Sequence, residues 1–488
     1  MDYILAYDLG TSGVKGALVT MQGQIAATAT VDYPYSLPKP GWAEQEPADY
    51  WQGVCDVTRE VLRRGNAAPE SVVGMAFGTL WKGIIPVDAA GNVLRSSILW
   101  LDSRAGEQAA KLNREFQTNV FVGSDYWSKL FWLRENEPET IEKAEMILEV
   151  NAFLKWKTTG IAAVDISNSY TRSPDPKLDN FYERLFTYMD IPREKFPTVV
   201  NSCDRVGEVT VKAAQELGLV PGIPVFGGNS DIQAVTVGAG CSETGGVHVY
   251  LGSSGWVGFT RPHREMSMLT HMDPQREVYM AGMRAVGLSL NWFVKRFYSA
   301  EWERLGGDVF RLMDHDAQQI PAGADGAMAL PWFFGEHGPC AGADVRGCFL
   351  NLKPEHDRKA MARALLEGIC FHLRLRMVHA CETQKMEIPQ CIHAVGGGAG
   401  SEVWMQILAD VMNIPVGVPE SPRHAGALGT AYSALIGLGI CKDDRDAAKC
   451  VRMERVYEPN PEAVAIYEAC FQRYVRLYGA LKPIFQMK

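Results

Sequence analysis

The sequence predicts a two-domain α/β protein, and three observations support this. The chain has 488 residues, more than a single hydrophobic core usually serves. Residues 6–19 read AYDLGTSGVKGALV, and a shorter echo, VYLGSSGWVG, follows at 249–258, about half a chain later. Strand-like and helix-like segments alternate after the first motif, as in α/β domains. The repeated opening predicts two domains, 1–243 and 244–488, with no low-complexity linker between them.

The composition fits an ordinary globular protein, with 47% hydrophobic and 22% charged residues. A formal charge of −9 argues against a nucleic-acid partner. The start, MDYILAYD, resembles a strand rather than a signal peptide, and the longest weakly polar stretch, 425–440, is too short to cross a membrane. The eleven cysteines include no CxxC pair, which indicates reduced thiols and no zinc site. We therefore expect a cytoplasmic protein with neither a nucleic-acid nor a membrane partner.

The first segments predict a β-meander followed by a helix and a strand. Residues 3–8 form an apolar run, and 16–35 continue as two strands joined by a QGQ turn. In 48–65 apolar residues recur at helical spacing, and Gly65 ends the run. The segment VVGMAFG, 72–78, predicts the next strand.

The remaining segments follow the same logic. Residues 130–150 have helical character interrupted at Pro138, and a helix at about 210–218 lies between two predicted strands. The second of these strands ends in GGNSD, 227–231. The second half opens with a strand, a Gly/Ser turn and another strand, and it closes with long helices at 356–384, 401–413 and 461–480.

The two turns suggest phosphate binding. A turn of small residues can point successive backbone NH groups at one spot, where an anion binds. In DLGTSG, Thr11 and Ser12 add hydroxyl groups, Lys15 adds a positive charge, and Asp8 is placed to hold Mg²⁺. The second turn, GSSG at 252–255, offers similar donors without the acid or the lysine. A pair of such hairpins suits a nucleotide's phosphates, whereas either hairpin alone favours a plain tight turn.

Other nucleotide and catalytic motifs are missing. Neither turn matches GxxxxGK[ST] or GxSxG, and the sequence has no HRD or DFG tripeptide. P-loop, hydrolase and protein-kinase interpretations therefore lose support.

Eight blocks of the sequence come in the order and at the spacing typical of FGGY carbohydrate kinases. The chain resembles the xylulokinases of that family most, over nearly its whole length. The blocks are DLGTSGVKG, PGWAEQEPADYW, ILWLDSR, GGNSD, LGSSG, LPWFFGEHGP with DVRG, AVGGGAGSEVWMQILADV and AGALGTA.

The resemblance implies two ribonuclease-H-like domains of the actin and hexokinase type, flanking a catalytic cleft. It implies a sugar site and catalytic base in residues 1–243 and an ATP site in 244–488. The implied reaction transfers the γ-phosphoryl group of Mg·ATP to a sugar hydroxyl. A homodimer is the oligomeric state that the resemblance suggests.

The resemblance also assigns site residues. Asp231 of GGNSD is the implied catalytic base, and a carboxylate suits that role because it can take the hydroxyl proton; capping the next helix is the alternative. Asp8 is the implied Mg²⁺ residue. The implied nucleotide-binding residues are Gly10, Thr11, Ser12, Lys15, Gly252, Ser253 and Ser254 at the phosphates and Gly396, Gly397 and Gly398 at the adenosine. A packing turn is the alternative for the last three.

Other matching residues have structural interpretations. Gly335 and Glu336 match a family GE pair, and Glu336 is a candidate Mg²⁺ or structural carboxylate. Asp102 and Arg104 match a W-x-D-x-R block, for which we expect an internal ion pair. The helical spacing of Trp404, Ile407, Leu408 and Val411 predicts core residues rather than nucleotide contacts.

The sequence departs from xylulokinases at the sugar-facing segment. TLWKG, 79–83, aligns with a typical GQMHG, so Trp81 and Lys82 are the candidate substrate-binding residues beside Asp231. Plain packing of Trp81 and solvation of Lys82 is the alternative. Ile232 and Gln233 replace a typical NAA, which suggests a second pocket change. We hypothesise a pentulose or related polyol that differs from xylulose as the acceptor, with an acidic sugar as one option.

Two further classes remain as alternatives. One is a non-catalytic, sugar-sensing relative of the same fold, and the other is an actin-like assembly protein or chaperone ATPase. The presence of Asp8, Asp231 and both turns argues against the first, and the PGWAEQEP block argues against the second.

Overall fold

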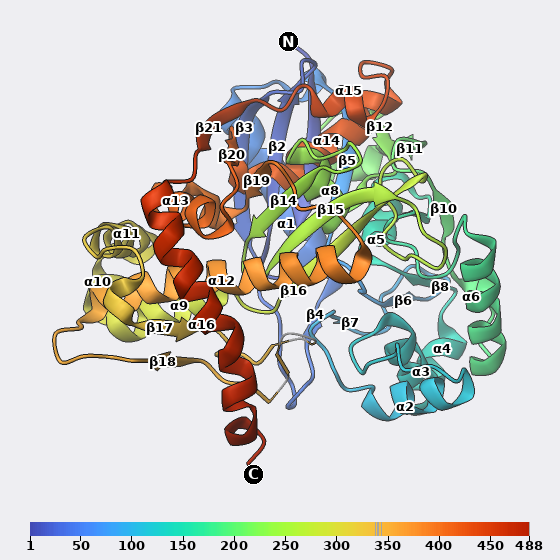
Figure 1. The fold of residues 1–488 in the computed structure, drawn as a ribbon. Helices are drawn as coiled ribbons and strands as arrows, with labels where there is room; N and C mark the ends of the chain where they lie inside the picture. Colours follow the sequence, from blue (N-terminus) through green and yellow to red (C-terminus); the bar gives the residue numbers. More distant parts are fainter. Residues whose placement is uncertain (337, 339–340, 343, 488) are drawn as a thin grey trace. The chain divides into compact units, whose positions relative to one another are not determined.

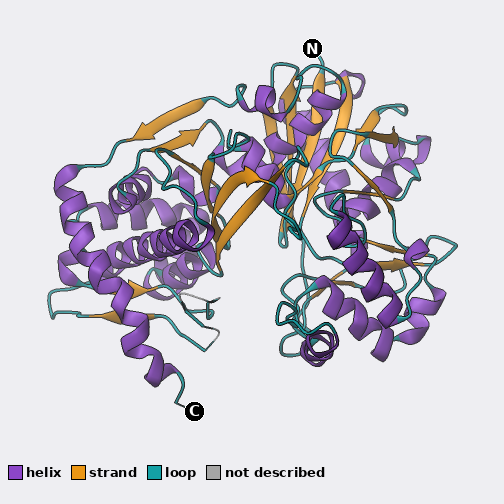
Figure 2. Cartoon of the chain, turned by 45° about the vertical axis from the view of Figure 1, so that its right-hand side comes forward, coloured by secondary structure: helices purple, strands orange, loops and turns teal. Residues whose placement is uncertain are grey.

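The chain folds into two compact units of helices and strands (Figures 1 and 2). The computed structural model describes residues 1–336, 338, 341–342 and 344–487. Unit 1 comprises Met1–Ser242, Pro262–Val278 and His424–Val451; unit 2 comprises Glu243–Arg261, Tyr279–Arg423 and Arg452–Lys488. The first crossing lies at the expected boundary, but two later segments join unit 1, so the second unit is not an uninterrupted 244–488.

Unit 1 is built on a sheet with the strand order β11-β12-β5-β1-β2-β3, in which β13 also pairs with β5. Strands β1, β2 and β3 are antiparallel neighbours, as the predicted meander requires, and β5 is parallel to β1. The strands are β1 (Tyr3–Leu9), β2 (Gly13–Thr20), β3 (Ile25–Asp32), β5 (Val72–Thr79), β11 (Arg205–Glu208), β12 (Pro224–Phe226) and β13 (Asn229–Ser230). Small pairs join β4 (Glu44–Gln45) to β7 (Ser97–Ile98), β6 (Ile85–Val87) to β8 (Met146–Leu148) and β9 (Ala163–Asp165) to β10 (Thr198–Val200).

The helices of unit 1 follow the sequence signals in part, because the end of the predicted helical segment 130–150 forms strand β8 (Met146–Leu148) instead. The helix predicted in 48–65 forms. Pro138 lies in the first turn of a new helix, where the NH group that proline lacks would have no partner within the helix. The helices are α1 (Pro47–Gly65), α2 (Gly106–Glu115), α3 (Tyr126–Asn136), α4 (Pro138–Lys143), α5 (Val150–Thr159), α6 (Pro176–Met189), α7 (Val211–Leu217), α8 (Asp231–Gly238), α14 (Ala425–Gly437) and α15 (Asp444–Ala448).

Helix α14 explains why a late segment of the chain belongs to unit 1. Its sequence, AGALGTAYSALIG, is apolar and small on nearly every side, and residues 425–435 are buried. A helix without a polar face needs apolar partners all round. Helix α14 finds them on β1, β5 and α8, in one hydrophobic cluster with Ile4, Ala76 and Val237.

Unit 2 holds most of a second sheet, with the order β16-β15-β14-β19-β20-β21. Its strands are β14 (Val247–Leu251), β15 (Gly255–Pro262), β16 (Arg276–Met283), β19 (Ile392–Val395), β20 (Val416–Pro419) and β21 (Met453–Tyr457), with β17 (Met328–Leu330) and β18 (Cys348–Leu350) as a separate pair. Its helices are α9 (Gly287–Phe297), α10 (Ser299–Leu305), α11 (Val309–Gln318), α12 (Arg358–Gln384), α13 (Glu402–Met412) and α16 (Pro461–Phe485).

The halfway echo in the sequence corresponds to a repeated topology. In unit 1 the hairpin β1–β2 adjoins the parallel strands β5 and β12; in unit 2 the hairpin β14–β15 adjoins the parallel strands β19 and β20. Each unit therefore carries one Gly/Ser turn at the end of its first strand.

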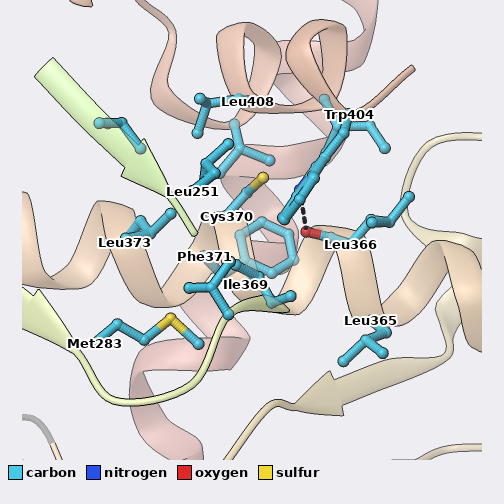
Figure 3. Close-up of a cluster of buried hydrophobic side chains, with 14 of the residues drawn as sticks. Leu251, Met283, Leu365, Leu366, Ile369, Cys370, Phe371, Leu373, Trp404 and Leu408 are labelled. Carbon is cyan, nitrogen blue, oxygen red and sulfur yellow. Dashed lines mark hydrogen bonds between the residues drawn. The ribbon is translucent and has the colours of Figure 1, made fainter. Parts of the chain in front are cut away.

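The core of unit 2 contains the residues predicted to be core on α13. Trp404, Ile407, Leu408 and Val411 are all buried. Figure 3 shows Trp404 among the side chains of α12, where its Nε1 donates to the backbone oxygen of Leu366 at 3.3 Å. The helical spacing thus reports packing of α13 against α12.

Candidate active site

Asp8 and Lys15 form an ion pair across the hairpin of unit 1. The two residues are register partners on β1 and β2, and Lys15 Nζ lies 2.9 Å from Asp8 Oδ2. Asp8 is 7% exposed, so its carboxylate is shielded from most of the solvent. Because Asp8 and Lys15 are opposite each other in the β1–β2 hairpin, the carboxylate and the ammonium lie side by side.

In the turn at residues 10–12, each backbone carbonyl group accepts a hydrogen bond from another part of unit 1. The Gly10 oxygen accepts from Tyr33 Oη at 2.7 Å, the Thr11 oxygen accepts from Gln45 Nε2 at 3.3 Å, and the Ser12 oxygen accepts from the Tyr33 amide at 3.1 Å. The amides of Thr11 and Ser12 find no acceptor among the described residues. Two free, adjacent NH groups of this kind are the donors an anion needs.

The hydroxyl of Thr11 is also oriented by the protein. Trp100 Nε1 donates to Thr11 Oγ1 at 2.9 Å. The hydroxyl therefore keeps its own hydrogen for a further acceptor.

Asp231 is the first residue of α8, directly after β13. Ser230 caps this helix, and Asp231 Oδ1 accepts the amide of Ile232 at 2.9 Å. The residue is half-buried. Removal of the carboxylate from water and the nearby charge of Asp8 raise the pKa of Asp231 to about 7. The cap of α8, the alternative role for Asp231, is Ser230. Asp231 is left with a carboxylate whose pKa lies near neutral pH.

Gly426 lies against Asp8. A Cβ on this glycine would lie 2.8 Å from Asp8 Cγ and Oδ2, so only glycine leaves the carboxylate in place. Gly426 belongs to the first turn of α14, whose free amides favour a nearby negative charge. Sequence reasoning grouped this residue in the AGALGTA block but gave it no role.

Two side chains of the TLWKG segment, Trp81 and Lys82, contact other residues of unit 1. Trp81 packs on Tyr170, with 5.2 Å between the ring centroids, and Lys82 Nζ lies 2.8 Å from Asp125 Oδ1. Lys82 therefore has an ionic partner, contrary to simple solvation. Its φ of +65° is a conformation that residues other than glycine rarely adopt.

Asp125 and Tyr170 are candidate site residues that sequence reasoning missed. Asp125 precedes α3, and Tyr170 follows β9 in a segment without any motif, so only proximity in the fold reveals them. The charges of Asp125 and Asp231 both act on the Tyr170 hydroxyl, and its pKa is raised chiefly by burial. Within the described residues, Tyr170 Oη and Trp81 Nε1 are buried without a hydrogen-bond partner.

The turn at residues 252–254 of unit 2 is built like its counterpart in unit 1. The Gly252 oxygen accepts from the Gly287 amide at 2.8 Å, and the Ser253 oxygen accepts from the Val286 amide at 3.0 Å. In the described part of the chain, the amides of Ser253 and Ser254 meet no acceptor.

The glycine run of unit 2 lies beside this turn. Strands β14 and β19 are parallel neighbours, and a Cβ on Gly396 would lie 2.7 Å from the backbone of Leu251. Gly397–Gly400 then form a short 3₁₀ turn before α13, and a Cβ on Gly397 would meet nothing within 4 Å. The structure thus brings together the unit 2 residues Gly252, Ser253, Ser254, Gly396, Gly397 and Gly398.

Glu336 has a structural contact. Its carboxylate is buried in unit 2 and accepts the backbone amide of Arg284 at 3.0 Å. His372 Nε2 lies 3.6 Å away, and burial lowers the pKa of this histidine to about 3, so the imidazole is neutral. These contacts favour the structural interpretation of Glu336.

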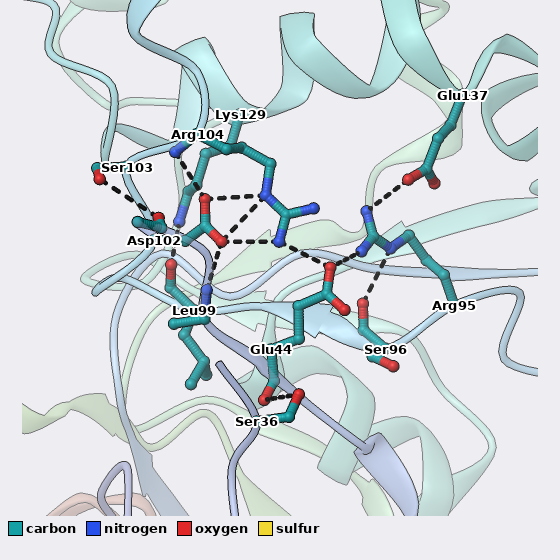
Figure 4. A network of polar contacts seen from close by, with 12 residues as sticks. Ser36, Glu44, Arg95, Ser96, Leu99, Asp102, Ser103, Arg104, Lys129 and Glu137 are labelled. Carbon is teal, nitrogen blue, oxygen red and sulfur yellow. Dashed lines mark hydrogen bonds and ion pairs between the residues drawn. The ribbon is translucent and has the colours of Figure 1, made fainter. Parts of the chain in front are cut away.

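Asp102 and Arg104 form the expected internal ion pair, shown in Figure 4. Arg104 Nη2 lies 2.7 Å from Asp102 Oδ2, both side chains are fully buried, and Arg104 also lies 2.7 Å from Glu44 Oε1. Asp102 Oδ2 accepts the amide of Ala43 at 2.6 Å. The pair therefore fixes the 43–44 segment to the 102–104 loop.

The side chains near the unit 1 turn fit a magnesium ion that is shared with phosphates. Mg²⁺ is usually held by one or two carboxylates together with phosphate oxygens and water. Asp8 is such a carboxylate, and Gly426, which packs against it, has no side chain that would displace it. Among the described residues no group of three or more acidic, histidine or cysteine side chains forms a self-sufficient metal site.

Two further properties bear on the sequence expectations. The described helices include none that is both long and apolar enough to span a membrane. Every cysteine among the described residues is a free thiol.

Comparison with known proteins extends over the whole chain. Residues 3–238 match the N-terminal domain and residues 247–438 the C-terminal domain of the FGGY family of carbohydrate kinases. The chain is 27% identical to a xylulose kinase of Bacillus subtilis, covering 99% of this chain and 98% of the relative. It is 30% identical to an autoinducer-2 kinase of Yersinia enterocolitica, covering 98% and 94%. The solved xylulose kinase structure from Rhodospirillum rubrum matches with a TM-score of 0.83 at 27% identity, covering 99% and 100% of the chains.

The mixed α/β units with repeated topology, and their match to solved kinases, define a two-domain kinase with the actin and hexokinase type of fold. The chain belongs to the FGGY family of carbohydrate kinases. It is a carbohydrate kinase similar to the xylulose kinases, and sugar kinases of this family use ATP, normally with Mg²⁺.

Proposed function

We propose that this kinase transfers the γ-phosphoryl group of Mg·ATP to a hydroxyl of a neutral, pentulose-like sugar, with Asp231 as the general base. The observation that carries the proposal is the pKa of Asp231, about 7, which burial and Asp8 raise. A general base is most effective when its pKa lies near the working pH. Asp231 thus takes the proton of the acceptor hydroxyl as the phosphoryl group arrives.

The two turns receive the nucleotide phosphates in this proposal. The free amides of Thr11 and Ser12 and the Lys15 ammonium serve this role in unit 1, and the amides of Ser253 and Ser254 serve it in unit 2. Asp8 would hold Mg²⁺, directly or through water, and the bound ion supplies charge neutralisation on the phosphates. The run from Gly396 to Gly398 receives the adenosine.

The acceptor site lies in unit 1, around the TLWKG segment. Trp81 is half-buried and offers a flat apolar face, backed by the buried ring of Tyr170. The buried Nε1 of Trp81 and Oη of Tyr170 lack hydrogen-bond partners within the described residues, which a sugar hydroxyl can supply. The ammonium of Lys82 is already neutralised by Asp125. This pairing favours a neutral polyhydroxy acceptor over the acidic sugar that Lys82 alone suggested, since an added carboxylate would compete with Asp125.

The experiment is an ADP-release assay with Mg·ATP over a panel of pentuloses, hexuloses, polyols and sugar acids. We expect a neutral ketose or polyol other than D-xylulose to give the highest kcat/KM, and Asp231→Ala to lose at least about a hundredfold in kcat. Asp204→Ala, a change in an exposed acid of the same unit, serves as the control. A sugar acid or D-xylulose as best acceptor, or an active Asp231→Ala, contradicts the corresponding part of the proposal.

A further inference from the structure

Gln233 is a buried side chain directly behind the proposed base. It lies two residues after Asp231 in the first turn of α8 and is 1% exposed. Its place in the sequence suggested a change in the substrate pocket, but its carboxamide bonds to other parts of unit 1. The side chain therefore has a different task from substrate contact.

The carboxamide of Gln233 holds the residues that precede the base. Its Oε1 accepts from Asn229 Nδ2 at 2.7 Å, and its Nε2 donates to the backbone oxygen of Thr270 at 3.3 Å. The backbone amide of Gln233 donates to Ser230 Oγ at 3.4 Å. The carboxamide thus holds Asn229 directly, whereas Ser230 is bonded by the backbone amide of Gln233.

A second layer fixes the carboxamide itself. The hydroxyls of Ser167 and Ser202 lie 3.2 and 3.3 Å from Gln233 Oε1, and both also lie within hydrogen-bonding distance of Asp165. Ser167 Oγ accepts the amide of Ser230 at 2.7 Å. Asp165, Ser167, Ser202 and Asn229 are all buried, so each lost bond leaves a polar group without a substitute from water.

The same network reaches α14. Ser433 Oγ donates to Asn229 Oδ1 at 2.9 Å, and α14 begins beside Asp8. Asn229 therefore joins the segment that carries Asp231 to the helix whose first turn carries Gly426.

We propose that Gln233 is a positioning residue for Asp231: its carboxamide locks β13 and the first turn of α8, and this sets the direction in which the base carboxylate points. The inference rests on the proposed function, because it assigns Gln233 to the base of that reaction. A base displaced by a fraction of an ångström loses catalytic efficiency while substrate binding is kept. Loss of the carboxamide should therefore lower kcat and leave KM nearly unchanged.

The test compares Gln233→Met, which keeps the length of the side chain without its hydrogen bonds, with Gln233→Glu, which keeps the Oε1 acceptor. Gln108→Met is the matched control, since Gln108 is also a buried glutamine of unit 1, and within the described residues its carboxamide bonds only to Glu135, through Nε2. We expect Gln233→Met to lower kcat about 10- to 100-fold, with KM for acceptor and ATP within about threefold of the parent. Gln233→Glu should recover part of kcat, and Gln108→Met should match the parent.

The outcomes separate the inference from the function on which it rests. A parent protein that phosphorylates no acceptor refutes the proposed function. An active parent whose folded Gln233→Met variant keeps kcat within twofold, or loses activity through KM alone, overturns the inference. If circular dichroism shows that Gln233→Met is unfolded, Ser167→Ala decides: it removes the Ser230 acceptor, and an unchanged kcat then overturns the inference.

Discussion

Lys15 and Asp8 are direct partners on neighbouring strands, and their side chains meet at 2.9 Å beside the turn that carries free amide groups. The negative charge of Asp8 also raises the pKa of Asp231. One hairpin register therefore couples the proposed Mg²⁺ residue, a cation for the phosphates and the proposed base.

We expect Asp8→Asn to lower kcat at least about tenfold and to raise the Mg²⁺ concentration that gives half-maximal activity, because an amide is a weaker ligand for Mg²⁺ than a carboxylate. Titrating Mg²⁺ at saturating ATP and acceptor measures both effects. Asp56→Asn, on the exposed face of α1, is the control. An unchanged Mg²⁺ requirement in Asp8→Asn contradicts the assignment.

The pH dependence of kcat should report the base. Asp231 must be ionised to accept a proton, so we expect kcat to rise with pH and to reach half its maximum at about pH 7. Lys15 lowers the pKa of Asp231 and Asp8 raises it. The midpoint should therefore move up in Lys15→Met and down in Asp8→Asn. Shifts in the same direction would contradict this electrostatic arrangement.

The ionised Asp231 carboxylate should lower the free energy of unfolding at neutral pH. Its pKa is about 7 when folded and about 4 when unfolded, so the folded state must hold a charge in a poorly solvated place as the pH rises from 4 to 7. We expect Asp231→Asn to be more stable than the parent by about 2 kcal/mol above pH 7, after an allowance for partial exposure, and the difference to vanish near pH 4. Urea unfolding at several pH values measures it, and a constant difference would speak against the raised pKa.

Close packing of α14 on α8 predicts a strong effect of one methyl group. A Cβ on Gly429 would lie 1.9 Å from the Ala234 oxygen, so Gly429→Ala must push the helices apart, at about 2–4 kcal/mol. Gly479→Ala in α16 is the matched control, because its Cβ would meet nothing within 4 Å and alanine favours helix by about 1 kcal/mol. Thermal unfolding should show opposite signs for the two variants.

The buried ion pair predicts that arginine cannot be replaced by lysine. Arg104 binds Asp102 through two nitrogen atoms, and its guanidinium lies 3.6 Å from the Trp42 ring centroid. Lysine has neither the fork nor the flat face, so we expect Arg104→Lys to lower the free energy of unfolding by about 2–4 kcal/mol. Arg63→Lys, at an exposed pair with Glu60, should leave the free energy of unfolding nearly unchanged. Equal losses would contradict the importance of burial.

The sequence by itself determined the opening strands, several of the helices, the family and the positions of the two Gly/Ser turns. Strand alternation and helical spacing depend on neighbours within a few residues, so the meander at 3–32, helix α1 and the core face of α13 could be predicted locally. The Gly/Ser turns could be found because glycine and small hydroxyl residues mark such turns directly.

Only the tertiary structure decided which distant residues meet. Helix α14 joins unit 1 because an all-apolar helix is stable only where the fold surrounds it, and a sequence pattern does not name that place. The partner of Lys82 is Asp125, 43 residues away, and the carboxamide of Gln233 meets Thr270, 37 residues away. Burial and charge from such distant partners set the pKa of Asp231, which a local sequence of GGNSD cannot reveal.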